Sequence, residues 1–252
     1  MSIVIGVSHK SYFGWERTLE WNQKVVEIIR KGPTDGSLEL FTFPAIPAIS
    51  ASLECFANTP MAIGAQDICA EAPGAWTGEI SAAIVQEMGC QYAEIGHAER
   101  RRFFNETIDI INKKIDMAFS CHLTPVICIG EPERMALSDA AAYAIAQAKE
   151  LLDQRSGPVP GVVFAWEPQW AIGAPKPASD EYIKYVCHAL RGFLHQHYGT
   201  QCKVIYGGSA GPGLLERLWP HVDGLFLGRF AHQPDSFALI LEEAQRLLSE
   251  ST

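Results

Sequence analysis

The feature that most restricts the fold of this chain is an alternation of eight short apolar segments with segments of helical periodicity. Aliphatic and aromatic residues dominate the apolar segments, as is typical of strands buried on both faces of a parallel sheet. These segments cover residues 3–7, 38–43, 61–65, 92–95, 125–129, 162–166, 203–206 and 224–227. In the helical segments one face stays apolar, for example at Ile183, Val186, Leu190 and Leu194. The alternation predicts an α/β fold with a parallel sheet.

Chain length favours one α/β architecture over the other. Eight strand-helix units in 252 residues are typical of a (β/α)₈ barrel, in which helices ring a parallel eight-stranded barrel. A doubly wound sheet of eight strands would usually carry more connecting sequence and a glycine-rich first turn. We find no linker and no low-complexity segment. The sequence therefore predicts a single barrel domain over residues 1–252.

Composition excludes several classes of partner. The net charge of −9 disfavours nucleic acids and anionic membranes as partners. No run of about 18 apolar residues occurs, and the first ten residues lack a basic region and a cleavage site, so we expect a soluble cytoplasmic protein. The seven cysteines are odd in number and never spaced as CxxC, which argues against a disulfide framework and a zinc site. We expect buried thiols.

Glu167 is the first candidate for a catalytic role, because it directly follows the apolar segment 162–166. An ionisable group at the end of a buried strand is costly unless it is used. Residues 168–178 after it are rich in proline and apolar side chains, a composition that suits a lid. A lid that excludes water would strengthen the electrostatics around a base. The alternative is a carboxylate that caps a neighbouring element in a proline-rich connection.

Two further loops carry charged residues at matching strand ends, where a barrel of this type places its chemistry. Lys10 follows the first strand, and His97 and Glu99 follow the fourth. Taken alone, the lysine could be a surface residue, the histidine a satisfied core residue and the arginines at 100–102 a solvated charge run. Together with Glu167 they form a candidate constellation.

The loops after the last two strands predict a site for an anion. Residues 207–213 read GGSAGPG, with Ser209 as the third residue, and Gly228-Arg229 follows the eighth strand. Such barrels often bind phosphate here, against backbone N–H groups that glycine lets a ligand approach. For either loop alone, a tight turn that needs glycine is the simpler interpretation.

At these residues the chain resembles the triosephosphate isomerase family over nearly its whole length. The resemblance is specific in four segments: AEIGHAERR at 93–101, WEPQWAIGAPKPA at 166–178, IYGGSAGPG at 205–213 and GAWTGEIS at 74–81. It implies a TIM barrel in which Lys10 is the cation, His97 the electrophile and Glu167 the base, supported by Glu99. It also implies that Gly173, Ser209 and Gly228 supply backbone donors to a phosphate. Cys128 and Tyr206 match supporting positions of the family.

Four positions depart from the family pattern. Ser8 stands where the family has an asparagine, so the side chain that would reach the substrate is shorter. Ala98 replaces a serine that would hold the resting base. Pro175 replaces a glycine at the lid tip, and Arg229 replaces the second glycine of the last phosphate loop. An inward Arg229 would bind phosphate oxygens, whereas an outward one would be a surface cation. We favour the inward orientation.

The function that the resemblance implies is interconversion of glyceraldehyde 3-phosphate and dihydroxyacetone phosphate through an enediolate, without a metal or organic cofactor. A family relative that isomerises a tetrulose phosphate is an alternative. A barrel that binds sugar phosphates without turnover is another, which the altered loop around Lys10 supports and the retained base opposes.

The segment that begins at Asp67 and ends at Ser81 predicts a homodimer. It is too long and too apolar for a plain connection of about 2–6 residues. In the family this loop packs beside the lysine-bearing loop of a second subunit. The alternative, an ordered surface loop with an exposed Trp76, would leave a patch that invites association.

Overall fold

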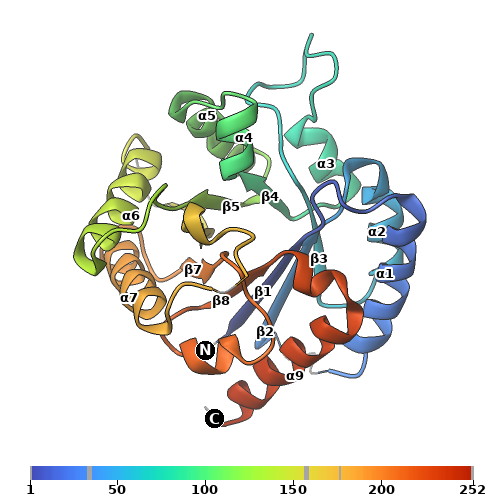
Figure 1. Ribbon diagram of the computed structural model, residues 1–252. Helices are drawn as coiled ribbons and strands as arrows, with labels where there is room; N and C mark the ends of the chain where they lie inside the picture. The colour runs from blue at the N-terminus through green and yellow to red at the C-terminus, as the bar shows by residue number, and fades with distance from the viewer. Residues whose placement is uncertain (1, 33–35, 156–158, 176, 251–252) are drawn as a thin grey trace.

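The computed structural model describes residues 2–32, 36–155, 159–175 and 177–250, in which eight parallel strands close into a barrel (Figure 1). Each strand pairs with its neighbour in sequence, and β1 also pairs with β8, with Val4 opposite Gly224. The strands are β1 (Ile3–Ser8), β2 (Leu38–Phe43), β3 (Met61–Ala65), β4 (Tyr92–Ile95), β5 (Thr124–Ile129), β6 (Val162–Trp166), β7 (Cys202–Tyr206) and β8 (Gly224–Leu227). The predicted (β/α)₈ fold is confirmed, and each predicted strand end lies within one residue of the observed one.

Helices ring the barrel and connect its strands (Figure 1). The longer ones are α1 (Trp15–Ile29), α5 (Ile108–Ser120), α6 (Leu137–Leu152), α7 (Asp180–His197) and α9 (Pro234–Glu250). Shorter helices and 3₁₀ turns are η1 (Ile46–Ala48), α2 (Ile49–Cys55), α3 (Ala82–Met88), α4 (Ala98–Phe103), η2 (Gln169–Ala171), α8 (Leu214–Leu218) and η3 (Arg229–His232). The start of α7 shows how local sequence sets these bounds, because the Ser179 side chain accepts a hydrogen bond from the Tyr182 N–H.

Two apolar cores explain why the strands are hydrophobic on both faces. The outer core lies between sheet and helices, and the predicted face of α7 is fully buried there. The inner core fills the barrel with residues such as Phe41 and Phe43. A Cβ at Gly6 would lie 2.2 Å from the Phe41 ring, and one at Gly64 would lie 2.3 Å from the Phe43 ring. The two glycines therefore make room for aromatic rings inside the barrel.

The cysteines follow the predicted pattern only in part. Five are buried as free thiols, but Cys55 and Cys121 are half-buried, so the expectation of buried thiols is wrong for these two. Cys55 ends α2 and Cys121 caps α5, and helix ends face outward more than strand interiors do. Among the described residues, no helix is long and apolar enough to cross a membrane. The cytoplasmic location stays a prediction.

Candidate active site

One large cavity, of about 760 Å³, opens at the carboxyl ends of the strands, and we call it the main cavity. All nine site residues predicted from the sequence line it: Ser8, Lys10, His97, Glu99, Glu167, Gly173, Ser209, Gly228 and Arg229. The barrel brings them together because parallel strands end at the same rim. Their individual roles stay predictions.

Glu167 is buried at the end of β6, with only 4% of its surface exposed. Its Oε2 atom has no hydrogen-bond partner and lies 3.3 Å from His97 Nε2. Burial and the charge of Glu94 raise the pKa of Glu167 well above its ordinary value, although Lys10 opposes the shift. A Cβ at Gly207 would lie 2.5 Å from Glu167 Cγ, so this glycine leaves the side chain its place. The result is a basic carboxylate with an unused acceptor atom.

His97 is held in one tautomer by the helix that it caps. Its Nδ1 accepts a hydrogen bond of 3.1 Å from the Glu99 backbone N–H at the start of α4. Because burial and then the Lys10 charge lower its pKa to about 4, the ring is neutral near pH 7. A neutral imidazole that accepts at Nδ1 carries its proton on Nε2. His97 therefore presents an N–H donor on the side of Glu167.

Lys10 and Glu99 form an ion pair on the wall of the main cavity. The Lys10 Nζ lies 2.7 Å from Glu99 Oε1, and the Lys10 backbone has a φ of 47°. Left-handed backbone at a non-glycine residue is unfavourable unless the surroundings hold it. Here Gln66 Nε2 donates to the Lys10 carbonyl at 2.9 Å. Burial would lower the pKa of Lys10, but the Glu99 hydrogen bond and nearby carboxylates raise it, so the ammonium stays charged.

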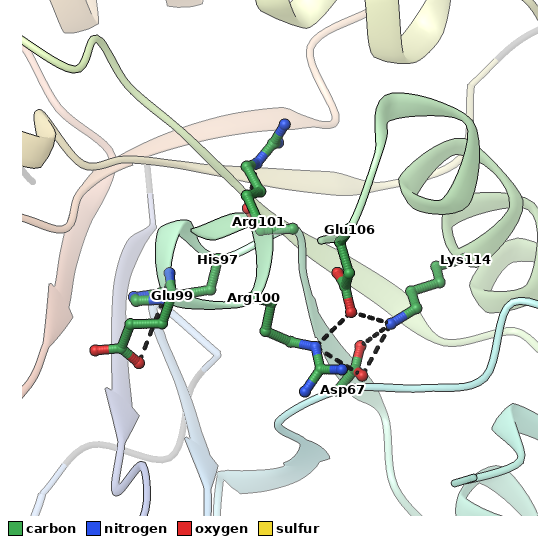
Figure 2. Close-up of polar contacts among 8 residues, drawn as sticks. Asp67, His97, Glu99, Arg100, Arg101, Glu106 and Lys114 are labelled. Atoms are coloured by element: carbon green, nitrogen blue, oxygen red, sulfur yellow. Dashed lines mark hydrogen bonds and ion pairs between the residues drawn. The ribbon is translucent and has the colours of Figure 1, made fainter. Parts of the chain in front are cut away.

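A network of four charged side chains, shown in Figure 2, holds α4 against the segment after β3 and against α5. Lys114 on α5 lies 2.6 Å from Asp67 Oδ1, and Arg100 on α4 lies 2.9 Å from Asp67 Oδ2. Both cations also pair with Glu106, and the Lys114 and Glu106 side chains are each only 4% exposed. The network joins the segment after β3, α4 and α5, and thereby positions His97 and Glu99.

One interpretation of the sequence was that the arginines after β4 form a solvated charge run. The structure contradicts it. Arg101 donates to the carbonyls of Gly96 and Cys128, at 2.7 and 3.1 Å. Together with Arg100 it ties α4 to its neighbours, and only Arg102 of the three is exposed.

Glu131 is a structural residue that sequence reasoning missed. It is fully buried and accepts hydrogen bonds from Trp166, Trp170 and Tyr182, at 3.2, 3.0 and 2.9 Å. These donors come from β6, the turn η2 at the start of the lid, and α7. Glu131 therefore anchors the base-bearing end of the lid. Its signal in the sequence is a carboxylate just after the apolar strand β5, the same pattern that singled out Glu167.

Four glycines, at positions 173, 207, 208 and 228, line the opposite wall of the main cavity. Gly173 has a φ of +68°, a conformation that favours glycine. The Ser209 N–H is bonded to the Ala171 carbonyl at 3.3 Å, so it must be released before it can donate to an anion. Ala178 N–H donates to the Tyr206 hydroxyl at 3.3 Å, so Tyr206 contacts the end of the lid segment. Lys176, in the middle of this segment, lies outside the described residues.

The Arg229 side chain lies between the inward orientation that the sequence analysis favoured and the outward alternative. It lines the main cavity, but it is exposed and donates from its guanidinium to the Gly173 carbonyl at 3.2 Å. In this structure it therefore joins the last loop to the lid and keeps donors in reach of the cavity.

Glu94 is the second residue that sequence reasoning missed. It lies within β4, is 4% exposed, and accepts a 3.0 Å hydrogen bond from Ser8 Oγ. Burial raises its pKa to about 7, although Ser8 and Lys10 oppose the shift. The sequence contained a signal, a carboxylate between Ala93 and Ile95 in an apolar strand. Because β4 is buried on both faces, its sequence has no alternation of polar and apolar residues. The sequence therefore did not indicate which face of the strand carries the Glu94 side chain.

The main cavity has the parts needed to remove a proton next to a carbonyl group. Glu167 is a desolvated carboxyl group, as a base for this step would be, and His97 and Lys10 carry the N–H donors that a developing negative charge on oxygen would need. The opposite wall offers backbone N–H groups and an arginine. Among the described residues, no group of three His, Cys, Asp or Glu side chains is arranged to hold a metal ion.

Comparison with known proteins agrees with this geometry. The family model described as triosephosphate isomerase matches residues 3–244. A protein of Pectobacterium atrosepticum named L-erythrulose-1-phosphate isomerase is 45% identical over 254 residues, which cover 99% of this chain and 98% of that protein. The triosephosphate isomerase of Thermus thermophilus is 36% identical, over 82% of this chain and 86% of that protein. A probable triosephosphate isomerase 2 of Listeria monocytogenes is 33% identical, over 94% and 95%.

Proposed function

The chain belongs to the triosephosphate isomerase family, and on this premise we propose that it isomerises a phosphorylated sugar by moving one proton between adjacent carbons. The observation that carries the proposal is the unpartnered Oε2 of Glu167, 3.3 Å from the Nε2 of His97 and buried in the main cavity. Although His97 Nε2 is this close, Oε2 accepts no hydrogen bond, so it is free to take a proton from a bound substrate.

In the proposed reaction, Glu167 removes a proton from the carbon next to the carbonyl group. The C–H electron pair becomes the C=C bond of an enediolate, and the carbonyl π pair moves to oxygen. His97 Nε2–H and the Lys10 ammonium stabilise that oxygen. Protonated Glu167 then returns the proton to the former carbonyl carbon, while the neighbouring hydroxyl gives its proton to the oxyanion. The carbonyl group re-forms one carbon along the chain.

We propose a four-carbon ketose 1-phosphate as the preferred substrate, in place of the triose phosphate that the family resemblance alone implies. Support comes from the 45% identity to a protein named L-erythrulose-1-phosphate isomerase. Ser8, shorter than the family's asparagine, leaves more room, and a second cavity of about 410 Å³ shares it and His97 with the main cavity. Triose phosphate isomerisation remains the second candidate, which the match to the family model favours.

The phosphate would bind at the wall opposite His97, where Gly173, Ser209, Gly228 and Arg229 line the main cavity. Backbone N–H groups and a guanidinium are suitable donors for its oxygens. Because the phosphate lies away from the reacting carbons, its binding energy can close the lid and orient the base.

We also propose that the active form is a homodimer joined through the segment from Asp67 to Ser81. Residues 72–79 are exposed, Trp76 has 49% of its surface exposed, and the segment extends away from the barrel at the top of Figure 1. Around the second cavity, Tyr12 and Phe104 are also exposed apolar residues that a partner could cover. Sedimentation that finds only a 27.7 kDa species at micromolar concentration would contradict this proposal.

The test of the proposed function is exchange of solvent deuterium into a panel of sugar phosphates, followed by NMR. The panel contains dihydroxyacetone phosphate, glyceraldehyde 3-phosphate and the 1- and 4-phosphates of L- and D-erythrulose. We expect exchange and a product whose carbonyl has moved by one carbon, with the highest kcat/KM on a four-carbon ketose 1-phosphate. A higher kcat/KM on the trioses would select the second candidate. Binding of the compounds without exchange would leave a barrel that binds sugar phosphates without turnover.

A further inference from the structure

Two buried residues, Ser8 and Glu94, line the second cavity, which adjoins the reacting centre and which we now call the side cavity. Its volume is about 410 Å³. It shares five residues with the main cavity, namely Ser8, Lys10, Tyr12, His97 and Glu99. Glu94 lines the side cavity and not the main one, whereas the phosphate-side residues line only the main cavity. The donors at the reacting centre thus lie between the phosphate wall and Glu94.

A substrate that spans these cavities must place its atoms in that order. In a four-carbon ketose 1-phosphate, the phosphate is on C1, the carbonyl is C2, and the proton to be moved is on C3. The C4 hydroxymethyl group extends beyond C3, away from the phosphate. In dihydroxyacetone phosphate, the carbon that gives up the proton is itself the end of the chain. Only the four-carbon compound therefore carries a group that reaches past Lys10 and His97.

We propose that Glu94, held by Ser8, accepts a hydrogen bond from the C4 hydroxyl group and so selects four-carbon over three-carbon substrates. This inference rests on the proposed function and assigns the residue that decides substrate length. Ser8 Oγ donates to Glu94 Oε2 at 3.0 Å and fixes the orientation of the carboxyl group. The other carboxyl oxygen stays available for a substrate hydroxyl. A site built to hydrogen-bond a hydroxyl group discriminates strongly against a compound that lacks it.

The surroundings of Glu94 suit a polar ligand. Lys10, Glu99 and Asp67 act on it electrostatically, and burial brings its pKa to about 7. Near neutral pH the carboxyl group can therefore accept from a hydroxyl in its ionised form or donate to one in its protonated form. Glu94 also raises the pKa of Glu167 through its charge. A second role, in which Glu94 only adjusts the base, would change turnover of every substrate by the same factor.

The experiment compares kcat/KM of wild type, Glu94→Gln and Ser8→Ala on L-erythrulose 1-phosphate and on dihydroxyacetone phosphate. We expect each substitution to lower the ratio of the two kcat/KM values by about 10- to 100-fold, the effect of losing one hydrogen bond to a charged group. Glu39→Gln is the matched control, because Glu39 pairs with Lys203 near the amino end of β2, away from both cavities. It should leave the ratio unchanged.

A 4-deoxy analogue of the four-carbon substrate gives a second test that needs no variant to fold. Wild type should use the analogue about as poorly as Glu94→Gln uses the full substrate, and Glu94→Gln should show little further loss with it. Equal losses on three-carbon and four-carbon substrates, or full activity of wild type on the 4-deoxy analogue, would overturn the assignment of Glu94. If wild type turns over trioses but no four-carbon phosphate, the substrate proposal itself fails, a result separate from either of these.

Discussion

The two walls of the main cavity are held in different ways. The wall formed by residues 92–103, which we call the β4–α4 wall, carries His97 and Glu99 and rests on a buried network of ion pairs. The lid wall is formed by residues 168–175 and the turns after β7 and β8. Its loops are joined by one long backbone hydrogen bond, from Ser209 to Ala171, and by one exposed arginine. One wall presents charged groups from a fixed frame, and the other presents backbone groups from a loop.

This difference matches two requirements of the proposed chemistry. Groups that stabilise a developing oxyanion are most effective when they do not reorganise during the reaction. Groups that enclose a phosphate must let the substrate enter and leave. Glu131 accepts from Trp166 and Trp170 at the end of the lid that follows Glu167, and from Tyr182 on α7 beyond the other end. Glu167 itself lies where the fixed wall and the lid meet.

The largest effect is expected at that junction. Glu167→Gln should keep the fold and phosphate binding, but kcat should fall by about 10²–10⁴ or more, because the amide cannot take the proton. Steady-state kinetics on the best substrate of the panel measure this loss, with inorganic phosphate binding and circular dichroism as controls. Turnover near that of wild type would remove Glu167 as the base.

Breaking the support of the β4–α4 wall should affect stability most. Lys114→Met leaves Asp67 and Glu106 buried with only Arg100 as a partner, which should destabilise the protein by about 3–5 kcal/mol. Urea unfolding with an unchanged m-value measures the change. The adjacent Lys113→Met is the matched control, since Lys113 pairs with Glu71 at an exposed site and its loss should change stability little. Similar losses in both variants would show that the network does not support this wall.

The pH dependence should separate activity from stability. The raised pKa of Glu167 means that kcat/KM should fall about tenfold per pH unit below that pKa, at a higher pH than for an ordinary carboxyl group. Folding stability should change in the opposite direction. The contribution of Glu167 is complete below its ordinary pKa of 4.5 and is lost as pH rises through the raised pKa. A kcat/KM profile that is flat down to pH 5 would contradict the shift.

The smallest effect is expected from the lid wall. Arg229→Gly removes the contact to the Gly173 carbonyl and the guanidinium that we propose as a hydrogen-bond donor to the phosphate. KM should therefore rise about tenfold, with a smaller change in kcat. Arg246→Ala, on the exposed pair with Glu216, is the control. Unchanged kcat/KM on all substrates, at low and high salt, would make Arg229 a surface residue without a role in binding.

Much of the site followed from the sequence because strand ends are local features. An apolar run followed by Glu167, or by His97 with Glu99, marks a barrel rim without knowledge of any contact. The eight strands followed for the same reason, since burial on both faces leaves a continuous apolar run. The start of α7 is local in the same way, because the Ser179 side chain caps it and two acids, Asp180 and Glu181, occupy its first turn.

Only the tertiary structure decided which partners these groups meet. The pairing of Ser8 with Glu94 joins β1 to β4, and the network of Asp67, Arg100 and Lys114 joins three segments that no local pattern relates. The pKa shifts of Glu94 and Glu167 likewise depend on burial, which the closed barrel creates. Periodicity and strand ends are properties of neighbouring residues, so the sequence determines them. Hydrogen bonds, charge pairs and desolvation depend on distances across the fold, so they exist only once the barrel has closed.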